Sequence, residues 1–391
     1  MIVDRERFLR DGYLIVPGCI PPDQLESLRG SFETLVDRQR KIWVRARREG
    51  DPPGGAWETA PQPRLFYDEV VDAATADTVE FLLHENTRGV SRQLLQAEEA
   101  AVLALFLMCS PQRDHGPAKW HRDLHPFDQA PVAGLQADLV ENAPAGVQWN
   151  VPLYDDDVLW VVPGSHRRLN TAAENEQLAA DDRVPLPNGI PVELKAGDGV
   201  VYSNIILHWG SNYSARLRRT INFGYRGFGG PSYPYVSQFY WTAGFGRDLS
   251  PATRAAFDRF ESLFQAELRR IVAFFKAVIA RDETSFRREL EALHPGEKAR
   301  VVCLVLLSKL ARKICLQEQD FGYDLKRADE VRRHFDEGEL SALWKRFALL
   351  DSWLQSEDLQ VGQGLQREPN RYYYDDIPAS VGIDEFIANW S

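Results

Sequence analysis

The feature that most constrains the fold is a series of short apolar runs between Ala101 and Arg226, each ended by turn-forming residues. The turns include Pro-Gly-Ser at 163–165 and Ala-Gly-Asp at 196–198. Short runs at near-regular spacing are typical of strands in an antiparallel sandwich or jelly roll. Six runs are expected to form strands: Val102–Met108, Val147–Leu153, Val158–Val162, Val192–Leu194, Gly199–Tyr202 and Thr220–Tyr225.

Helical periodicity lies on the N-terminal side of this region. A short strand, Tyr13–Val16, is expected to precede a helix over 22–40, where Pro21 and Pro22 form a helix-start signal. Helical spacing returns between Ala74 and Leu95. The stretch 46–64 is rich in proline and glycine, so we interpret it as a structured loop.

The C-terminal part of the chain is mainly helical. Ser250 and Pro251 form an N-cap and first-turn pair that opens a helix to Ala280. Its stripe of Phe257, Phe260 and Phe264 is expected to pack on the strand-rich domain, with a dimer face as the second reading. Further helices are expected at 284–292, 296–315, 326–335 and 338–355. The chain of 391 residues is thus predicted to divide into residues 1–245 and a helical extension, 246–391.

Composition excludes several classes of protein. Forty-six basic and 57 acidic residues give a formal charge of −11, which disfavours nucleic-acid and anionic-membrane partners. The longest apolar stretch falls far short of the roughly 20 residues that span a bilayer. The four cysteines contain no C-x-x-C pair, and the first residues lack the basic region of a signal peptide. We therefore expect a cytoplasmic protein with reduced cysteines.

Three residues have the pattern of a metal site. His121 and Asp123 are two positions apart, so on an extended segment both side chains point the same way and Arg122 points away. His208 is expected to end an apolar strand that follows the turn at 197–198. Two histidines and one carboxylate on one face of an octahedron leave three positions open, as in non-haem Fe(II) oxygenases. Taken singly, each histidine also fits a hydrogen-bonded core or surface residue.

An arginine eleven residues past His208 matches a 2-oxoglutarate co-substrate. The distal carboxylate of 2-oxoglutarate is planar, and the guanidinium fork of Arg219 can bind both of its oxygens. The 1-carboxylate and keto oxygens would take two of the open metal positions and O2 the third. Arg218 is adjacent and would face the opposite way, so only one of the two can serve. Two surface charges are the alternative reading.

Residues 6 to 230 resemble the phytanoyl-CoA dioxygenase family of iron and 2-oxoglutarate oxygenases. The motifs that carry the resemblance occur in the family's order: FLRDGY at 8–13, WHRDLH at 120–125, LWVVPGSH at 159–166, Gly-Asp at 197–198 and Arg-Arg at 218–219. The family usually reads His-Gly-Ser after the distal histidine, whereas this chain has His-Trp-Gly-Ser at 208–211. The resemblance implies an α+β fold with a double-stranded β-helix (jelly-roll) core in residues 1–245.

The resemblance also implies an activity and its residues. Fe(II) would bind His121, Asp123 and His208, and 2-oxoglutarate would bind Arg219. The reaction would oxidise an unactivated C–H bond of a small molecule, such as a specialised metabolite, consume O2, and release succinate and CO2. Trp149 falls where family members that resemble this chain place an aromatic or polar residue beside the 2-oxoglutarate, with a core tryptophan as the alternative reading. The candidate substrate contacts are Trp120, Arg122, His125 and Trp160, which flank the expected ligands.

Several outcomes and alternatives remain open from the residues. Related halogenases replace the carboxylate ligand by a small residue, so Asp123 favours hydroxylation over halogenation. Desaturation, cyclisation and epimerisation use the same oxidant. A non-catalytic jelly-roll binding protein and a zinc-dependent hydrolase on the same ligands are the competing classes. The helices of 246–391 are expected to form a lid or a homodimer face.

Overall fold

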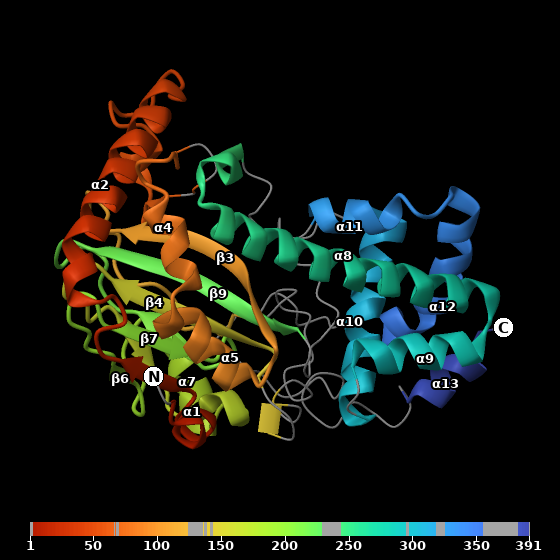
Figure 1. Ribbon diagram of the computed structural model, residues 1–391. Helices are drawn as coiled ribbons and strands as arrows, with labels where there is room; N and C mark the ends of the chain where they lie inside the picture. Colours follow the sequence, from red (N-terminus) through yellow and green to blue (C-terminus); the bar gives the residue numbers. More distant parts are fainter. Residues whose placement is uncertain are drawn as a thin grey trace.

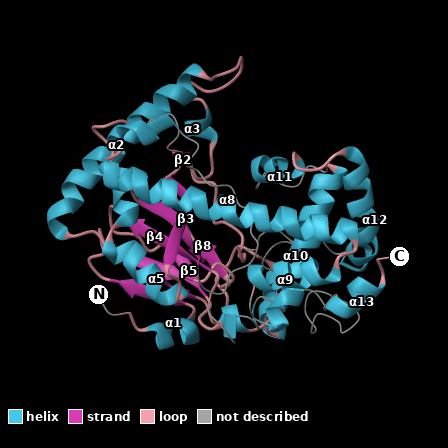
Figure 2. Ribbon diagram, turned by 45° about the vertical axis from the view of Figure 1, so that its right-hand side comes forward, coloured by secondary structure: helices cyan, strands magenta, loops and turns pink. Residues whose placement is uncertain are grey.

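The computed structural model describes residues 3–65, 67, 70–123, 136, 139–140, 144–228, 244–294, 297–317, 325–354 and 382–390. The strands gather in one half of the molecule, and the helices that follow α8 gather in the other (Figures 1 and 2). Neighbouring strands pair antiparallel in two sheets. The expected mixture of helices and antiparallel sheet is confirmed.

The larger sheet has six strands in the order β1-β7-β4-β9-β3-β2, and the smaller has three in the order β6-β5-β8. Two of the strands that carry site residues, β4 and β9, are neighbours in the larger sheet, with Asn150 opposite Asn222. The strand bounds are β1 Tyr13–Val16, β2 Arg64–Leu65, β3 Glu99–Cys109, β4 Gly146–Pro152, β5 Leu159–Val161, β6 Ile190–Pro191, β7 Gly199–Tyr202, β8 His208–Gly210 and β9 Arg219–Phe228.

Helices cover the larger sheet and build the second half of the molecule (Figure 1). The α-helices are α1 Arg5–Asp11, α2 Pro22–Arg45, α3 Ala56–Thr59, α4 Asp77–Glu80, α5 Val90–Leu95, α7 Ala172–Ala180, α8 Pro251–Ala280, α9 Glu283–Leu293, α10 Glu297–Leu316, α11 Leu325–Arg332, α12 Glu337–Leu354 and α13 Ile383–Ala388. Single turns of other helix types are η1 Phe81–Leu83, η2 Glu85–Gly89, η3 Ser165–Arg167 and η5 Gly244–Asp248. Across these ranges no helix combines the length and apolarity that a membrane span requires.

Local signals in the sequence set several of these bounds. The strand Tyr13–Val16 has the predicted limits, and the helix Pro251–Ala280 begins and ends where expected. The Ser250 side chain accepts a hydrogen bond from the Thr253 backbone N–H, which satisfies one of the unpaired donors of the first turn. The prediction for His208 was wrong in one respect: it begins β8 after a turn, rather than ending the strand that follows residue 198.

The helix α8 joins two apolar cores. Phe257, Phe260 and Phe264 are buried in the cluster formed by the larger sheet and the helices over it, and Phe264 packs edge-on against Phe228 of β9. Residues from Leu268 onward belong to a second cluster with α9 to α13. The predicted packing of the phenylalanine stripe on the strand-rich part is confirmed, so these three side chains lie inside the molecule.

Candidate metal centre

The two histidines meet through their backbones. The His121 N–H donates to the His208 carbonyl and the His208 N–H donates to the His121 carbonyl, each at 3.0 Å. This antiparallel bridge holds the two imidazole rings with their centroids 4.2 Å apart. The segment before β8 also receives Asp123, whose N–H donates to the Asn204 carbonyl at 2.8 Å. Residues 81 or more positions apart in sequence are thus fixed side by side by main-chain hydrogen bonds.

The three side chains converge on one point. Asp123 Oδ1 lies 3.7 Å from His121 Nε2, and Asp123 Oδ2 lies 3.4 Å from His208 Nε2. The candidate ligand atoms all lie within 4.8 Å of one another. Two ligands about 2.1 Å from one ion and at right angles are about 3 Å apart, so a small closure of this set would hold a divalent cation.

The histidine tautomers suit a metal. Each Nδ1 lies against a backbone carbonyl, His121 with Lys119 O at 2.8 Å and His208 with Ile206 O at 2.9 Å. A carbonyl can only accept, so each Nδ1 carries a proton and each Nε2 faces the carboxylate as the atom available to an ion. Metal-binding histidines are oriented in this way by a partner on their second nitrogen.

The electrostatics keep His121 and Asp123 deprotonated. Burial, and then the charge of His208, lower the pKa of His121 to about 4. Burial opposes ionisation of Asp123, but the charges of His208 and His121 and hydrogen bonds from His208 and Gln148 lower its pKa below the usual range. The side chains of His121 and Asp123 nevertheless keep 27% and 20% of their surface exposed. The ligand set is surrounded by protein and still reachable from solvent.

A polar face of the larger sheet supports the carboxylate. Gln148 Nε2 donates to Asp123 Oδ2 at 2.8 Å. On the same face, Asn222 Nδ2 donates to Asn150 Oδ1 at 2.7 Å, and both asparagines are buried. The ring of Tyr202 lies 5.4 Å from that of His208. Sequence reasoning missed these residues, although Gln148 and Asn150 alternate with apolar residues in β4, a signal that one face of that strand is polar.

Trp149 lies on the opposite face of β4 from Gln148. It is fully buried, stacks on Phe223 at 5.9 Å, and donates from Nε1 to Ser91 Oγ at 2.9 Å. Successive side chains of a strand alternate between faces, so the contact of Gln148 with Asp123 places Trp149 on the side covered by helices. The structure does not bring this predicted co-substrate residue to the triad.

The same alternation separates the two arginines. Arg219 Nε lies 3.0 Å from Glu33 Oε1 of α2, on the helix-covered face. Arg218 precedes β9 and is in phase with Asn222, so it lies on the face that carries the polar residues. Its Nε donates to Asp156 Oδ2 at 2.8 Å, and its guanidinium lies 5.4 Å from the centre of the Tyr213 ring. Of the two, Arg218 shares the face of the triad.

The predicted substrate residues lie elsewhere. Trp120 stacks on Trp209 with centroids 5.4 Å apart, and Trp160 packs edge-on against Trp209 at 5.7 Å. Trp209 follows His208 in β8 and therefore points to the other face of the smaller sheet, so this tryptophan cluster is core on the side away from the triad. Arg122 is fully buried and bonds to backbone carbonyls, and His125 lies outside the described residues.

Two histidines and one carboxylate, held between two antiparallel sheets with one side accessible, define a facial-triad metalloprotein. The model of one family, described as phytanoyl-CoA dioxygenase (PhyH), matches residues 8–220, which is more than half of the chain. The chain belongs to the phytanoyl-CoA dioxygenase family. The matched segment contains all three residues of the triad.

Three solved structures are among those similar to part of this chain. AviO1 from Streptomyces viridochromogenes Tue57 is 23% identical, with 58% of this chain and 95% of that one covered and a TM-score of 0.39. The non-haem α-ketoglutarate-dependent epimerase SnoN from nogalamycin biosynthesis is 19% identical, covering 57% and 79%, with a TM-score of 0.38. EctD from S. alaskensis is 16% identical, covering 65% and 86%, with a TM-score of 0.43. Among curated proteins, none matches the chain significantly.

Proposed function

We propose that this chain is a non-haem Fe(II)- and 2-oxoglutarate-dependent oxygenase that hydroxylates an unactivated C–H bond of a small molecule. The observation that carries the proposal is the convergence of His121, Asp123 and His208, each with its nearest ligand atom facing the others. Membership of the family supports the same cofactors. The ligand types suit iron, because imidazole nitrogen and carboxylate oxygen are the donors of the facial-triad oxygenases.

The protein's part in the reaction is binding and orientation. In such a site Fe(II) supplies O2 activation coupled to conversion of 2-oxoglutarate into succinate and CO2. Gln148 holds one carboxylate oxygen of Asp123, which leaves the other to turn toward an ion. The carbonyls of Lys119 and Ile206 fix the two imidazole rings. These contacts set the three ligands before any ion arrives, which lowers the cost of binding one.

We assign the 2-oxoglutarate carboxylate to Arg218 rather than to Arg219. Arg218 is buried and shares a face with the residues around the triad, whereas Arg219 pairs with Glu33 under α2. Burial opposes ionisation of Asp156, but the charge of Arg218 and a hydrogen bond from Thr220 lower its pKa. Asp156 then holds the Nε side of the guanidinium, so the terminal amino groups of Arg218 are the donors that a second carboxylate would meet.

Residues 1–245 are proposed to form the catalytic domain, with its two sheets as a double-stranded β-helix. The position of the triad between the sheets supports this organisation. The helices from α9 onward have their own apolar core and are proposed to form a lid or a homodimer face. Light scattering of the purified chain at increasing concentration distinguishes these roles, because a dimer face doubles the mass and a lid leaves it unchanged.

The reaction outcome rests on Asp123. Its carboxylate occupies the position that a halide would need, so hydroxylation is the proposed outcome, with epimerisation, cyclisation and desaturation as the other products of one oxidant. A zinc-dependent hydrolase on the same ligands is the second candidate, since zinc accepts two imidazoles and a carboxylate. A jelly-roll binding protein without turnover is the third.

One assay separates the candidates. The purified chain is incubated with Fe(II), ascorbate, O2, 2-oxoglutarate and a panel of metabolites, and succinate is measured. We expect succinate that depends on Fe(II) and O2 and is abolished in His121→Ala. The absence of succinate together with hydrolysis supported by zinc under anaerobic conditions would identify the hydrolase, and the absence of both would identify the binding protein.

A further inference from the structure

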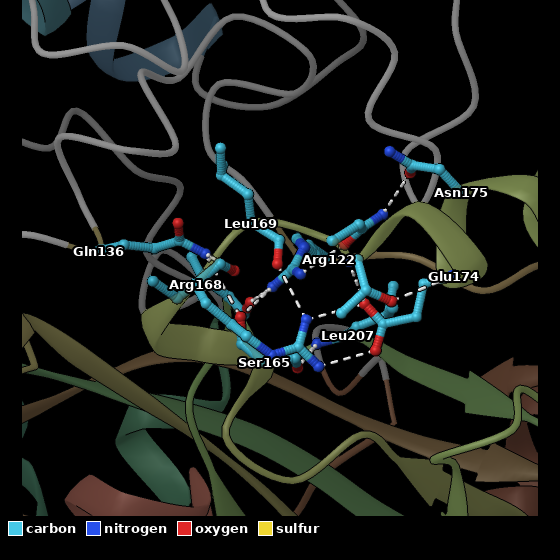
Figure 3. Close-up of polar contacts among 11 residues, drawn as sticks. Arg122, Gln136, Ser165, Arg168, Leu169, Glu174, Asn175 and Leu207 are labelled. Atoms are coloured by element: carbon cyan, nitrogen blue, oxygen red, sulfur yellow. Dashed lines mark hydrogen bonds and ion pairs between the residues drawn. The ribbon is translucent and has the colours of Figure 1, made fainter.

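Arg122 lies between two metal ligands in sequence but reaches away from them. Its side chain is fully buried. Nη1 donates to the Ser165 carbonyl at 2.8 Å (Figure 3). Nη1 also donates to the Ile205 carbonyl, and Nη2 donates to Asn170 Oδ1 at 2.8 Å. One guanidinium therefore joins the segment of His121 and Asp123 to two other segments of the chain. A neutral residue of this length could not satisfy all three acceptors.

Both segments that Arg122 holds lead to His208. Ile205 is three residues before His208, and its carbonyl is tied directly to Arg122. Ser165 accepts Arg122 at its carbonyl and accepts the Leu207 backbone N–H at its Oγ, at 2.8 Å (Figure 3). The Leu207 carbonyl in turn accepts the Val162 N–H at 2.9 Å. The main chain immediately before His208 is thus fixed through contacts that start at Arg122.

The main-chain contacts beside the triad do not by themselves fix the angle between the His121–Asp123 segment and the segment that leads to His208. The His121–His208 bridge and the Asp123–Asn204 hydrogen bond connect them along one line of main-chain contacts. Arg122 adds a brace on the opposite side of its own segment, because side chains at successive positions of extended chain point to opposite sides. Two connections on opposite sides resist a rotation that one line of contacts would permit.

One buried carboxylate offsets part of the positive charge around this brace. Glu174 is 1% exposed and receives both terminal nitrogens of Arg168, at 2.7 and 2.8 Å. Burial opposes ionisation of Glu174, but hydrogen bonds from Arg168 and Thr171 and the charges of Arg168 and Arg122 lower its pKa. Figure 3 shows Glu174 and Arg168 beside Arg122 around the turn that begins at Ser165. The carboxylate is paired with Arg168 and, at longer range, also lowers the cost of burying the charge of Arg122.

We propose that Arg122 is a positioning residue that sets the geometry of the metal ligands by bracing the main chain before His208 against the His121–Asp123 segment. The proposal rests on the metal site of the proposed function. It makes a prediction of definite sign. Removing a buried cation near a site for a divalent cation should tighten metal binding if charge alone matters, because like charges repel. Loss of a brace should weaken metal binding, because the ligands must then be ordered on binding.

The test is the affinity of the full-length, metal-free chain for Ni(II), measured by isothermal titration calorimetry. We expect Arg122→Gln to weaken Ni(II) binding by about 10-fold or more, the range found when partners of metal ligands are removed. Arg122→Lys keeps the positive charge but lacks the planar set of N–H donors of the guanidinium, so it should also weaken Ni(II) binding. Ser165→Ala keeps the carbonyl that Arg122 holds, removes the acceptor of the Leu207 N–H, and should give a smaller loss.

Arg168→Gln is the matched control. It removes a neighbouring guanidinium from the same network but touches neither ligand segment, so it should lower the unfolding midpoint of the metal-free chain and leave Ni(II) affinity within twofold. The proposal is overturned if Arg122→Gln and Arg122→Lys bind Ni(II) as tightly as the wild type or more tightly, while His121→Ala abolishes binding. In that case the proposed function still stands. If His121→Ala leaves Ni(II) binding unchanged in the wild-type background, the metal site fails and this inference fails with it.

Discussion

His166 should make the stability of this protein depend on pH in a defined window. The ring is fully buried, and Nε2 donates to the Leu9 carbonyl at 3.0 Å. On its other edge, Nδ1 faces Gly12, where an added Cβ would lie only 2.4 Å away. Burial lowers the pKa of His166 to about 4, despite the opposing contribution of the hydrogen bond to Leu9. The neutral imidazole is therefore the form that fits the fold.

The size of the effect follows from the two pKa values. An unfolded histidine titrates near pH 6.5, so as pH falls the unfolded chain takes up this proton first and the folded state loses relative stability. With a folded pKa of about 4, the loss attributable to His166 is about 2 kcal/mol at pH 5 and about 3 kcal/mol at pH 4, and it levels off at lower pH.

The assay is urea denaturation of the wild type and of His166→Gln at pH 7, 6, 5 and 4. Glutamine keeps an N–H donor for the Leu9 carbonyl but cannot be protonated in this range. We expect the difference in unfolding free energy between the two proteins to shrink by about 3 kcal/mol from pH 7 to pH 4. A difference that stays constant with pH would show that His166 does not resist protonation, and the argument from burial would be refuted.

Three other changes test separate parts of the account. Arg218→Gln should raise the KM for 2-oxoglutarate by about 10-fold or more, because a charge-assisted contact with the carboxylate is lost. Arg219→Gln should change this KM less than twofold. If steady-state kinetics show the larger effect for Arg219→Gln, Arg219 is the residue that binds 2-oxoglutarate. Gly12→Ala should lower the free energy of unfolding by about 1–3 kcal/mol, because φ of Gly12 is +85° and the added methyl group would collide with His166. An unchanged midpoint of urea denaturation would contradict this. Gln148→Leu should weaken Ni(II) binding by about 10-fold in a calorimetric titration, since it frees a carboxylate oxygen of the ligand set; equal affinity would make the contact incidental.

Local chemistry explains what the sequence predicted well. The limits of α8 follow from Ser250, Pro251 and an uninterrupted helical stripe, all of which are short-range signals. The pairing of His121 with Asp123 follows from the two-residue period of extended chain, which needs no knowledge of the partner strand. The helix Ala172–Ala180 was missed although its capping box, Thr171 with Glu174, is present in the sequence.

Long-range pairing explains what the sequence could not supply. Which face of a strand points to the site depends on its register with neighbours, and a shift of one residue exchanges the faces. That is why the sequence did not show that Gln148, and not Trp149, faces Asp123, or that Arg219 faces Glu33. His208 was placed at the end of a strand because its apolar neighbours suggested one, whereas those neighbours form a turn that Arg122 and Ser165 hold.

The most direct test of the central claim is the structure of the chain crystallised anaerobically with Fe(II) and 2-oxoglutarate, with anomalous data collected at the iron edge. We expect one anomalous peak bonded to Nε2 of His121, Nε2 of His208 and a carboxylate oxygen of Asp123, with the distal carboxylate of 2-oxoglutarate on Arg218. Iron bound elsewhere, or 2-oxoglutarate seated against Arg219 on the helix-covered face, would contradict it.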